Sequence, residues 1–174
     1  AKLLTKFFKT ARTLVKKQLV DADEEEARQI KKDIAEAEGI AENTLRGLAT
    51  EYDKEARKLR GKSQRRGFMY ARDLYAHYLD VFPKPAKDAT VNYVFFMHFY
   101  YAEVLYKLED FLAAARNYDR VLEINPSPKD KKQKKLVIAA AEESVRSYDE
   151  VVKDLDRANP PDVSGVDKKS IPAI

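Results

Sequence analysis

Apolar side chains recur every three or four residues along most of the chain, which is the spacing that places them on one face of an α-helix. Breaks in this pattern, most of them at prolines or polar clusters, divide it into segments. The pattern predicts six helices, at about 2–20, 21–61, 67–81, 88–108, 111–125 and 131–157. Because every predicted element is helical, the expected fold class is all-α. Residues 159–174 are expected to be extended or disordered.

The first two predicted helices would form a long N-terminal hairpin over residues 1–61. Beside its apolar stripe, the first helix carries a face of cations only, which are Lys2, Lys6, Lys9, Arg12, Lys16 and Lys17. Two interpretations fit this composition: the apolar stripe packs on the second helix, or the helix docks on an anionic membrane surface. We favour packing, because a basic face beside an apolar one is ordinary in surface helices. The acidic run that follows would stabilise the start of the second helix through the helix dipole.

The sharpest basic cluster lies in a polar stretch between the second and third predicted helices, bracketed by glycines, where we expect a solvated loop. Its cations are Arg60, Lys62, Arg65 and Arg66. The cluster has no interleaved aromatic residues and therefore lacks the stacking platform of proteins that bind single-stranded nucleic acid. A second basic run opens the sixth helix and includes Lys131, Lys132 and Lys135. If the fold brings the two runs together, they would form a positive surface for a polyanion or an anionic lipid; otherwise they are solubilising charge.

Two stretches of the sequence repeat similar residue types at the same offsets. The first contains Phe68, Ala71, Tyr75, Tyr78 and Pro83, and the second contains Phe111, Ala114, Tyr118, Val121 and Pro126. Together with the preceding Tyr101, Ala102 and Leu105, the second stretch resembles the tetratricopeptide repeat, with His98 where tryptophan is usual. The two prolines lie 43 residues apart, whereas the family's period is about 34. Extra helical turns or a longer loop are therefore expected before the second copy.

The sixth helix would be the first half of a further repeat whose second half is missing. Its candidates for burial are Leu136, Ile138, Ala139, Ala141, Val145, Tyr148, Val152 and Leu155. The resemblance implies a tetratricopeptide-like solenoid of antiparallel helix pairs over residues 62–158, with long flanking helices. In such a solenoid, the small side chains at the repeat positions let paired helices approach each other closely.

Tetratricopeptide proteins usually bind a peptide or a partner helix on a concave surface. The resemblance places Phe96, Phe99, Glu103 and Tyr106 on that surface. The Lys and Asn residues with which some members clamp the C-terminal carboxylate of a chaperone are absent from these positions, so that ligand is not expected. The three aromatic residues are equally compatible with a groove for apolar side chains and with a helix core.

A second, less specific resemblance concerns residues 92–97, which follow a proline-rich entry. This run is similar to tetratricopeptide-type proteins of the Gram-negative envelope, such as the lipoprotein of the outer-membrane β-barrel assembly machine and gliding-motility proteins. The similarity implies a periplasmic or outer-membrane-associated setting. No apolar run approaches the roughly 20 residues that a membrane-spanning helix needs. Because the chain starts without methionine, we expect it to be a part of a longer protein.

The composition argues against catalysis and against a bound cofactor or metal. With 0 Cys and 2 His, the chain has no cysteine nucleophile, no thiolate zinc site and no three-histidine metal site. The net charge of +4 comes from 33 Lys+Arg and 29 Asp+Glu, a mixture unlike the one-sided surface of nucleic-acid readers. We therefore expect a non-catalytic scaffold that binds a protein or peptide partner, of undetermined oligomeric state. The alternative is an electrostatic binder of anionic membrane or nucleic acid, through the first helix and the cluster at 60–66.

Overall fold

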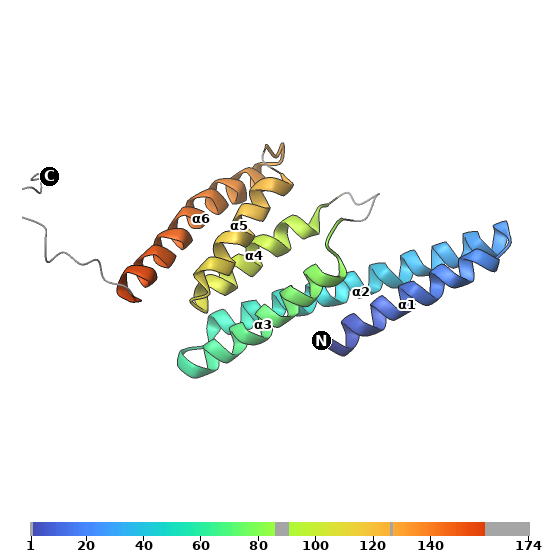
Figure 1. The fold of residues 1–174 in the computed structure, drawn as a ribbon, viewed down its shortest axis with the longest axis horizontal. Helices are drawn as coiled ribbons and strands as arrows, with labels where there is room; N and C mark the ends of the chain where they lie inside the picture. Colours follow the sequence, from blue (N-terminus) through green and yellow to red (C-terminus); the bar gives the residue numbers. More distant parts are fainter. Residues whose placement is uncertain (1, 86–90, 126, 159–174) are drawn as a thin grey trace, which may run out of the picture.

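The computed structural model describes residues 2–85, 91–125 and 127–158. In these residues the secondary structure consists of six helices, which are α1 (Lys2–Asp21), α2 (Glu24–Lys58), α3 (Gly61–Val81), α4 (Tyr93–Lys107), α5 (Phe111–Ile124) and α6 (Lys131–Ala158) (Figure 1). The predicted all-α class is confirmed for this part of the chain. The expectation for residues 159–174 falls outside the described residues.

Side chains at the helix starts explain where several helices begin. The carboxylate of Asp23 accepts a hydrogen bond from the backbone N–H of Glu26 and caps α2, whose first turn is acidic. Asn92 and Asp110 cap α4 and α5 in the same way, each accepting from the N–H three residues later. Asp130 accepts from the N–H of Gln133 at the start of α6. The acidic start of the second helix is thus confirmed.

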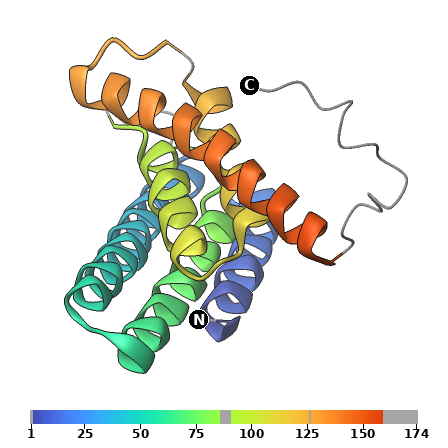
Figure 2. The ribbon, with the colours of Figure 1, turned by 90° about the vertical axis from the view of Figure 1, so that its left-hand side faces the viewer.

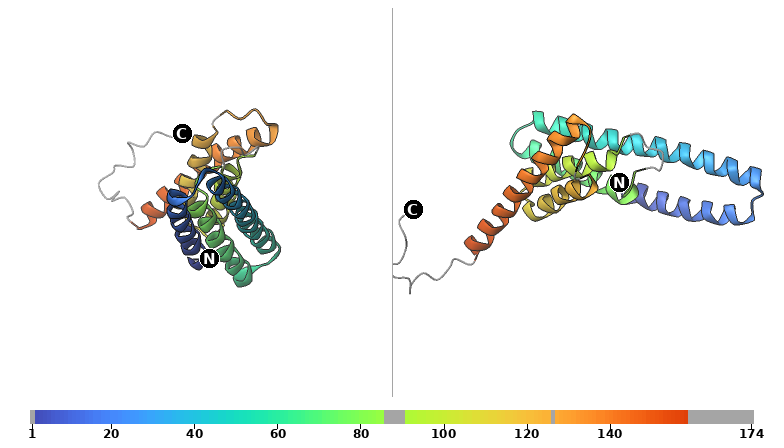
Figure 3. Two further views of the ribbon diagram at one scale, coloured as in Figure 1. Left: turned by 90° about the vertical axis from the view of Figure 1, so that its right-hand side faces the viewer. Right: turned by 90° about the horizontal axis from the view of Figure 1, so that it is seen from above.

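The helices form two antiparallel pairs, α2–α3 and α4–α5, with α1 beside the first pair and α6 beside the second. α2 packs on α3, α4 packs on α5, α3 contacts α4 between the pairs, and α6 packs on α5. Figure 2 shows α6 at one edge of the molecule, on the far side of α4 and α5 from α2 and α3. Figure 3 shows α1 alongside the first half of α2, projecting beyond the other helices. The expectation that α1 packs on α2 is incomplete, because α1 also contacts α3: Arg12 pairs with Glu38 of α2 and donates to the carbonyl of Val81.

Two clusters of buried side chains hold the pairs together. The first joins α2, α3 and α4, and its large members include Tyr75, Tyr78, Val81, Met97 and Val104. The second joins α4, α5 and α6, and its members include Phe95, Leu105, Ala114, Tyr118, Val121 and Ala140. Because α4 contributes to both clusters, it has little amphipathic character and lies at the centre of the fold.

The solvated loop expected at residues 60–67 is wrong, because α3 starts at Gly61 and extends through this stretch. Gly61 has a φ of 58°, a left-handed conformation that glycine adopts without strain, and it lets the chain turn into α3. Gly67 lies against α2: a Cβ on it would sit 2.8 Å from the Cβ of Ala56. Since α5 starts at Phe111, the counterpart of Phe68, α3 has about two extra turns at its start.

The fourth helix was expected from about residue 88, and this start is wrong, because α4 begins at Tyr93. The 43-residue spacing between the repeat prolines is therefore taken up by a longer connection between α3 and α4. Residues 86–90 of that connection lie outside the described residues. Within the described ranges, no helix is both long enough and apolar enough to cross a bilayer.

Candidate functional site

A tyrosine on the second helix of each pair donates a hydrogen bond to a carboxylate on the first helix. In the α4–α5 pair, the Tyr118 hydroxyl lies 2.7 Å from Oε1 of Glu103. In the α2–α3 pair, the Tyr75 hydroxyl lies 3.5 Å from Oδ2 of Asp53. Burial raises the pKa of both tyrosines above its ordinary value, and the adjacent carboxylates raise it further. Both hydroxyls therefore stay protonated and act as donors.

Arg57 joins the two pairs. Its Nε lies 2.8 Å from Oδ1 of Asp53 on the same helix, and its Nη1 lies 3.8 Å from Oε2 of Glu103 on α4. Burial raises the pKa of the Asp53 carboxyl, and the hydrogen bond from Arg57 opposes that increase. Each carboxylate of this network already has a partner, so the arrangement positions helices and offers no free nucleophile or base. In the residues that the structure describes, no group of three His, Cys, Asp or Glu is placed to hold a metal ion.

The four residues expected on a concave surface do not form an open apolar groove. Phe99 is 8% exposed and packs edge-on against the ring of Tyr118, with 5.8 Å between centroids. Phe96 and Tyr106 are half-buried, and Tyr106 packs against Phe111 at 5.2 Å. Glu103 is half-buried in the network with Tyr118. Of the two alternatives left open by the sequence, the structure therefore places Phe99 in the core.

The two basic runs lie near opposite ends of α4. The ammonium nitrogen of Lys132 lies 5.6 Å from the ring centroid of Phe96, in the first turn of α4. At the other end, Arg65 and Lys107 line the same pocket. Phe96 and Lys107 are eleven residues apart, about 16 Å along a helix. The runs therefore do not form one surface, and Lys131, Lys132 and Lys135 are separate from the cluster that contains Arg60, Lys62, Arg65 and Arg66.

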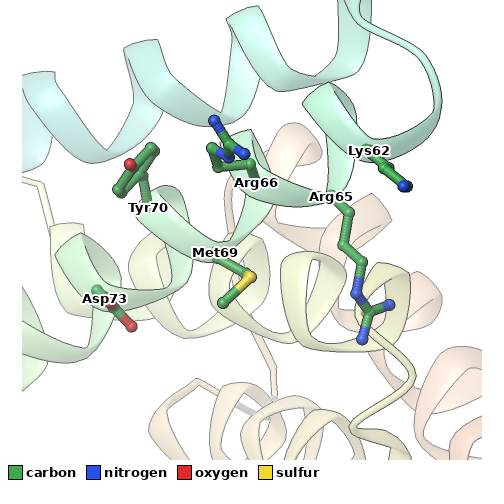
Figure 4. A pocket seen from close by; sticks show the side chains of 6 residues that line it. All are labelled: Lys62, Arg65, Arg66, Met69, Tyr70 and Asp73. Atoms are coloured by element: carbon green, nitrogen blue, oxygen red, sulfur yellow. The ribbon is translucent and has the colours of Figure 1, made fainter.

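The basic cluster at the start of α3 lies beside exposed apolar side chains that the sequence analysis did not predict. A shallow pocket of about 320 Å³ lies on its outward face, and Figure 4 shows the residues that line it, which are Lys62, Arg65, Arg66, Met69, Tyr70 and Asp73. A second pocket, of about 360 Å³, is lined by Arg57, Gly61, Gln64, Arg65, Phe68 and Lys107. Within the described part of the chain, Lys62, Arg65 and Arg66 make no ion pair. The surface is therefore cationic and partly aromatic.

The apolar face expected to be buried on α6 is largely exposed. We name five of its members the α6 stripe, and their exposed fractions are Ile138 60%, Val145 71%, Tyr148 40%, Val152 53% and Leu155 58%. The expectation that these five side chains are buried is wrong for the described residues, because α6 packs on α5 with a different face.

The face of α6 that packs on α5 is made of small residues. Ala140, Ser144 and Ser147 are buried, and their size allows the two helices to approach closely. Asp119 of α5 accepts a hydrogen bond from the Ser144 hydroxyl of this face at 2.5 Å, and another from the Tyr148 hydroxyl of the α6 stripe at 2.7 Å. The seven-residue spacing of the exposed valines and isoleucine was the available sign of a second apolar face.

A cavity of about 480 Å³ lies between α1, α2, α3 and the start of α4. Four of its polar side chains are paired with one another: the Tyr78 hydroxyl donates to Glu42 at 2.6 Å, and Arg12 pairs with Glu38 at 2.6 Å. The exposed surfaces of α6 and α3 are therefore the better candidates for function. Comparison of the chain with protein-family models, with curated proteins and with solved structures found no significant match.

Proposed function

We propose that the chain is a non-catalytic protein-interaction module, a short tetratricopeptide-like stack of helix pairs on which a partner helix packs at α6. The observation that carries this proposal is the α6 stripe. Apolar side chains 40% to 71% exposed run along a helix that buries only its small residues. A contiguous exposed apolar surface of this kind marks a binding site for another protein.

The two helix pairs support the scaffold part of the proposal. Each pair carries the same tyrosine-to-carboxylate hydrogen bond, and Arg57 links the pairs. In a solenoid, each internal helix is covered by its neighbours, and within the described residues no helix covers the α6 stripe. The half-buried Phe96, Glu103 and Tyr106 remain proposed secondary contacts for a partner. A bacterial envelope assembly remains the proposed setting, from the resemblance of residues 92–97.

Replacing Val145 and Val152 together by glutamate is expected to abolish partner binding and leave the fold intact. Both side chains are more than half exposed, so the charges stay in water and the helix content by circular dichroism should not change. Partners captured by the wild-type protein are purified, and their Kd is measured by titration calorimetry. We expect the Kd to rise by at least about tenfold in the variant, because apolar residues at the centre of an interface carry most of the binding energy.

The matched control is Ile40→Glu/Leu48→Glu, which places the same two charges on exposed apolar positions of α2. This control should bind as the wild type does. Equal binding by the wild type and the Val145→Glu/Val152→Glu variant, with both folded, would contradict the proposal that α6 is the docking surface.

The surface at the start of α3 supports a second candidate function, the binding of an anionic membrane surface. Three cations without ion pairs in the described chain stand beside Met69 and Tyr70, which are 43% and 53% exposed. Tyr70 packs edge-on against Tyr52 of α2, which is 45% exposed and enlarges the aromatic part. Basic residues beside exposed aromatic and apolar side chains are typical of proteins that lie at the lipid headgroup level.

Co-sedimentation with lipid vesicles tests this second function. The protein should bind vesicles that contain phosphatidylglycerol, and bind much less when salt rises from about 50 mM to about 200 mM, because screening weakens exposed charge contacts. The variant Lys62→Glu/Arg66→Glu should lose binding, whereas Lys31→Glu/Lys54→Glu on α2 should keep it. Binding to phosphatidylcholine vesicles alone with the same affinity would contradict an electrostatic origin.

A further inference from the structure

The α6 stripe has the spacing of a coiled-coil seam. Ile138, Val145 and Val152 are seven residues apart, and Tyr148 and Leu155 each follow one of the valines by three residues. This alternation of three and four residues is the pattern by which one helix packs lengthwise on another. From Ile138 to Leu155 the seam is about 26 Å long. Its size and direction therefore fit a second helix of two to three heptads lying along α6.

One edge of the seam is acidic. Glu142, Asp149 and Asp156 are seven residues apart and directly follow the second seam position of each heptad, so they lie in one row beside the stripe. All three are exposed. Asp149 pairs only with Lys153 of the same helix, and no ion pair within the described chain involves Glu142 or Asp156. Charges at this position in paired helices face the flank of the partner and select it.

This acidic row argues against a second copy of α6 as the occupant. In an antiparallel pair of α6 helices, the two acidic rows would face each other, and like charges at this position repel. In a parallel pair, the row would face the opposite edge of the seam, which α5 covers at the buried Ser144. A helix with cations along one edge can pair with the acidic row in a parallel or an antiparallel arrangement.

We propose, building on the proposed function above, that the α6 stripe binds an amphipathic helix with an apolar heptad seam and Lys or Arg along one edge. The apolar side chains of that helix cover Val145, Val152 and their neighbours. Its cations face Glu142, Asp149 and Asp156. The apolar seam supplies the affinity, and the acidic row selects the partner by charge.

Two synthetic helical peptides of three heptads test the selection. They share the same leucine and isoleucine seam, and they differ only at the flanking positions, which carry lysine in one peptide and glutamate in the other. Binding to the full chain is followed by fluorescence anisotropy. We expect the lysine peptide to bind at least about tenfold more tightly than the glutamate peptide, because like charges across an interface are strongly unfavourable.

A charge-reversed protein gives the second arm. In the variant Glu142→Lys/Asp149→Lys/Asp156→Lys, the preference should switch to the glutamate peptide. The matched control Glu36→Lys/Glu51→Lys/Glu55→Lys changes three exposed acids of α2 and should keep the wild-type preference. Val145→Glu/Val152→Glu should bind neither peptide.

The outcomes separate this proposal from the proposed function. If both peptides bind equally and only Val145→Glu/Val152→Glu abolishes binding, the stripe docks a helix but the acidic row does not select it, and this proposal is overturned alone. If neither peptide binds to the wild type, both proposals are overturned. Analytical ultracentrifugation tests whether a second copy of the chain covers the α6 stripe. If the wild type is a dimer and Val145→Glu/Val152→Glu is a monomer, a second copy covers the stripe and the proposal is overturned.

Discussion

Replacing Phe99 by glutamate is expected to lower the free energy of unfolding by at least about 4 kcal/mol, enough to unfold a protein of ordinary stability. The ring is 8% exposed and packs edge-on against Tyr100 and Tyr118. Truncating such a ring alone costs about 3–5 kcal/mol, and a carboxylate in its place also loses its hydration. Urea unfolding, followed by circular dichroism, measures the change.

The matched comparison is Val145→Glu, which introduces the same residue at a position that is 71% exposed. Its effect should stay within about 0.5 kcal/mol, as for most surface substitutions. The contrast between the two variants separates core from surface on α4 and α6. A Phe99→Glu protein with the wild-type urea midpoint would contradict the buried position and restore Phe99 as a groove residue.

Replacing Gly67 by valine is expected to destabilise the protein by about 2–3 kcal/mol, because the site between α2 and α3 has no room for a side chain. A Cβ at this position would lie 2.8 Å from the Cβ of Ala56 and 3.2 Å from its Cα, and the second of these atoms belongs to the backbone. The helices must therefore move apart. Thermal unfolding and urea titration both measure the loss.

Gly47→Ala is the control for this prediction, since a Cβ there has no atom within 4 Å. It should raise the free energy of unfolding by about 0.5–1 kcal/mol, the usual gain on replacing glycine within a helix. The free energy of unfolding of Gly67→Ala should lie between those of Gly67→Val and Gly47→Ala. Equal stability of Gly67→Val and the wild type would mean that α2 and α3 are farther apart at this point than the structure shows.

The sequence was sufficient to predict six helices, because helices follow from local periodicity, but it did not predict where α3 and α4 start. Asp110 caps α5. Tyr75 and Tyr118, which share an offset in the two similar stretches, both donate to a carboxylate of the preceding helix. These two tyrosines therefore share a hydrogen-bonding role as well as their offset in the sequence.

Sequence reasoning failed where the answer depends on which neighbour covers a face. Periodicity shows that α6 has an apolar face, but it does not show that α5 packs against the smaller Ser144 and Ser147 instead of that face. The same limit applies to Phe99, whose burial depends on Tyr118. At the start of α3, Gly67 suggested a loop because glycine weakens helices, whereas here it serves the contact with Ala56.

The extra turns at the start of α3 place charged side chains outside the buried core. Seven residues make nearly two helical turns, so the added segment carries its cations about 10 Å beyond the point of α3 that corresponds to the start of α5. Lys62, Arg65 and Arg66 are exposed on this overhang. Their charges can change without disturbing the core, so the electrostatic character of this end of the molecule can change while stability is kept.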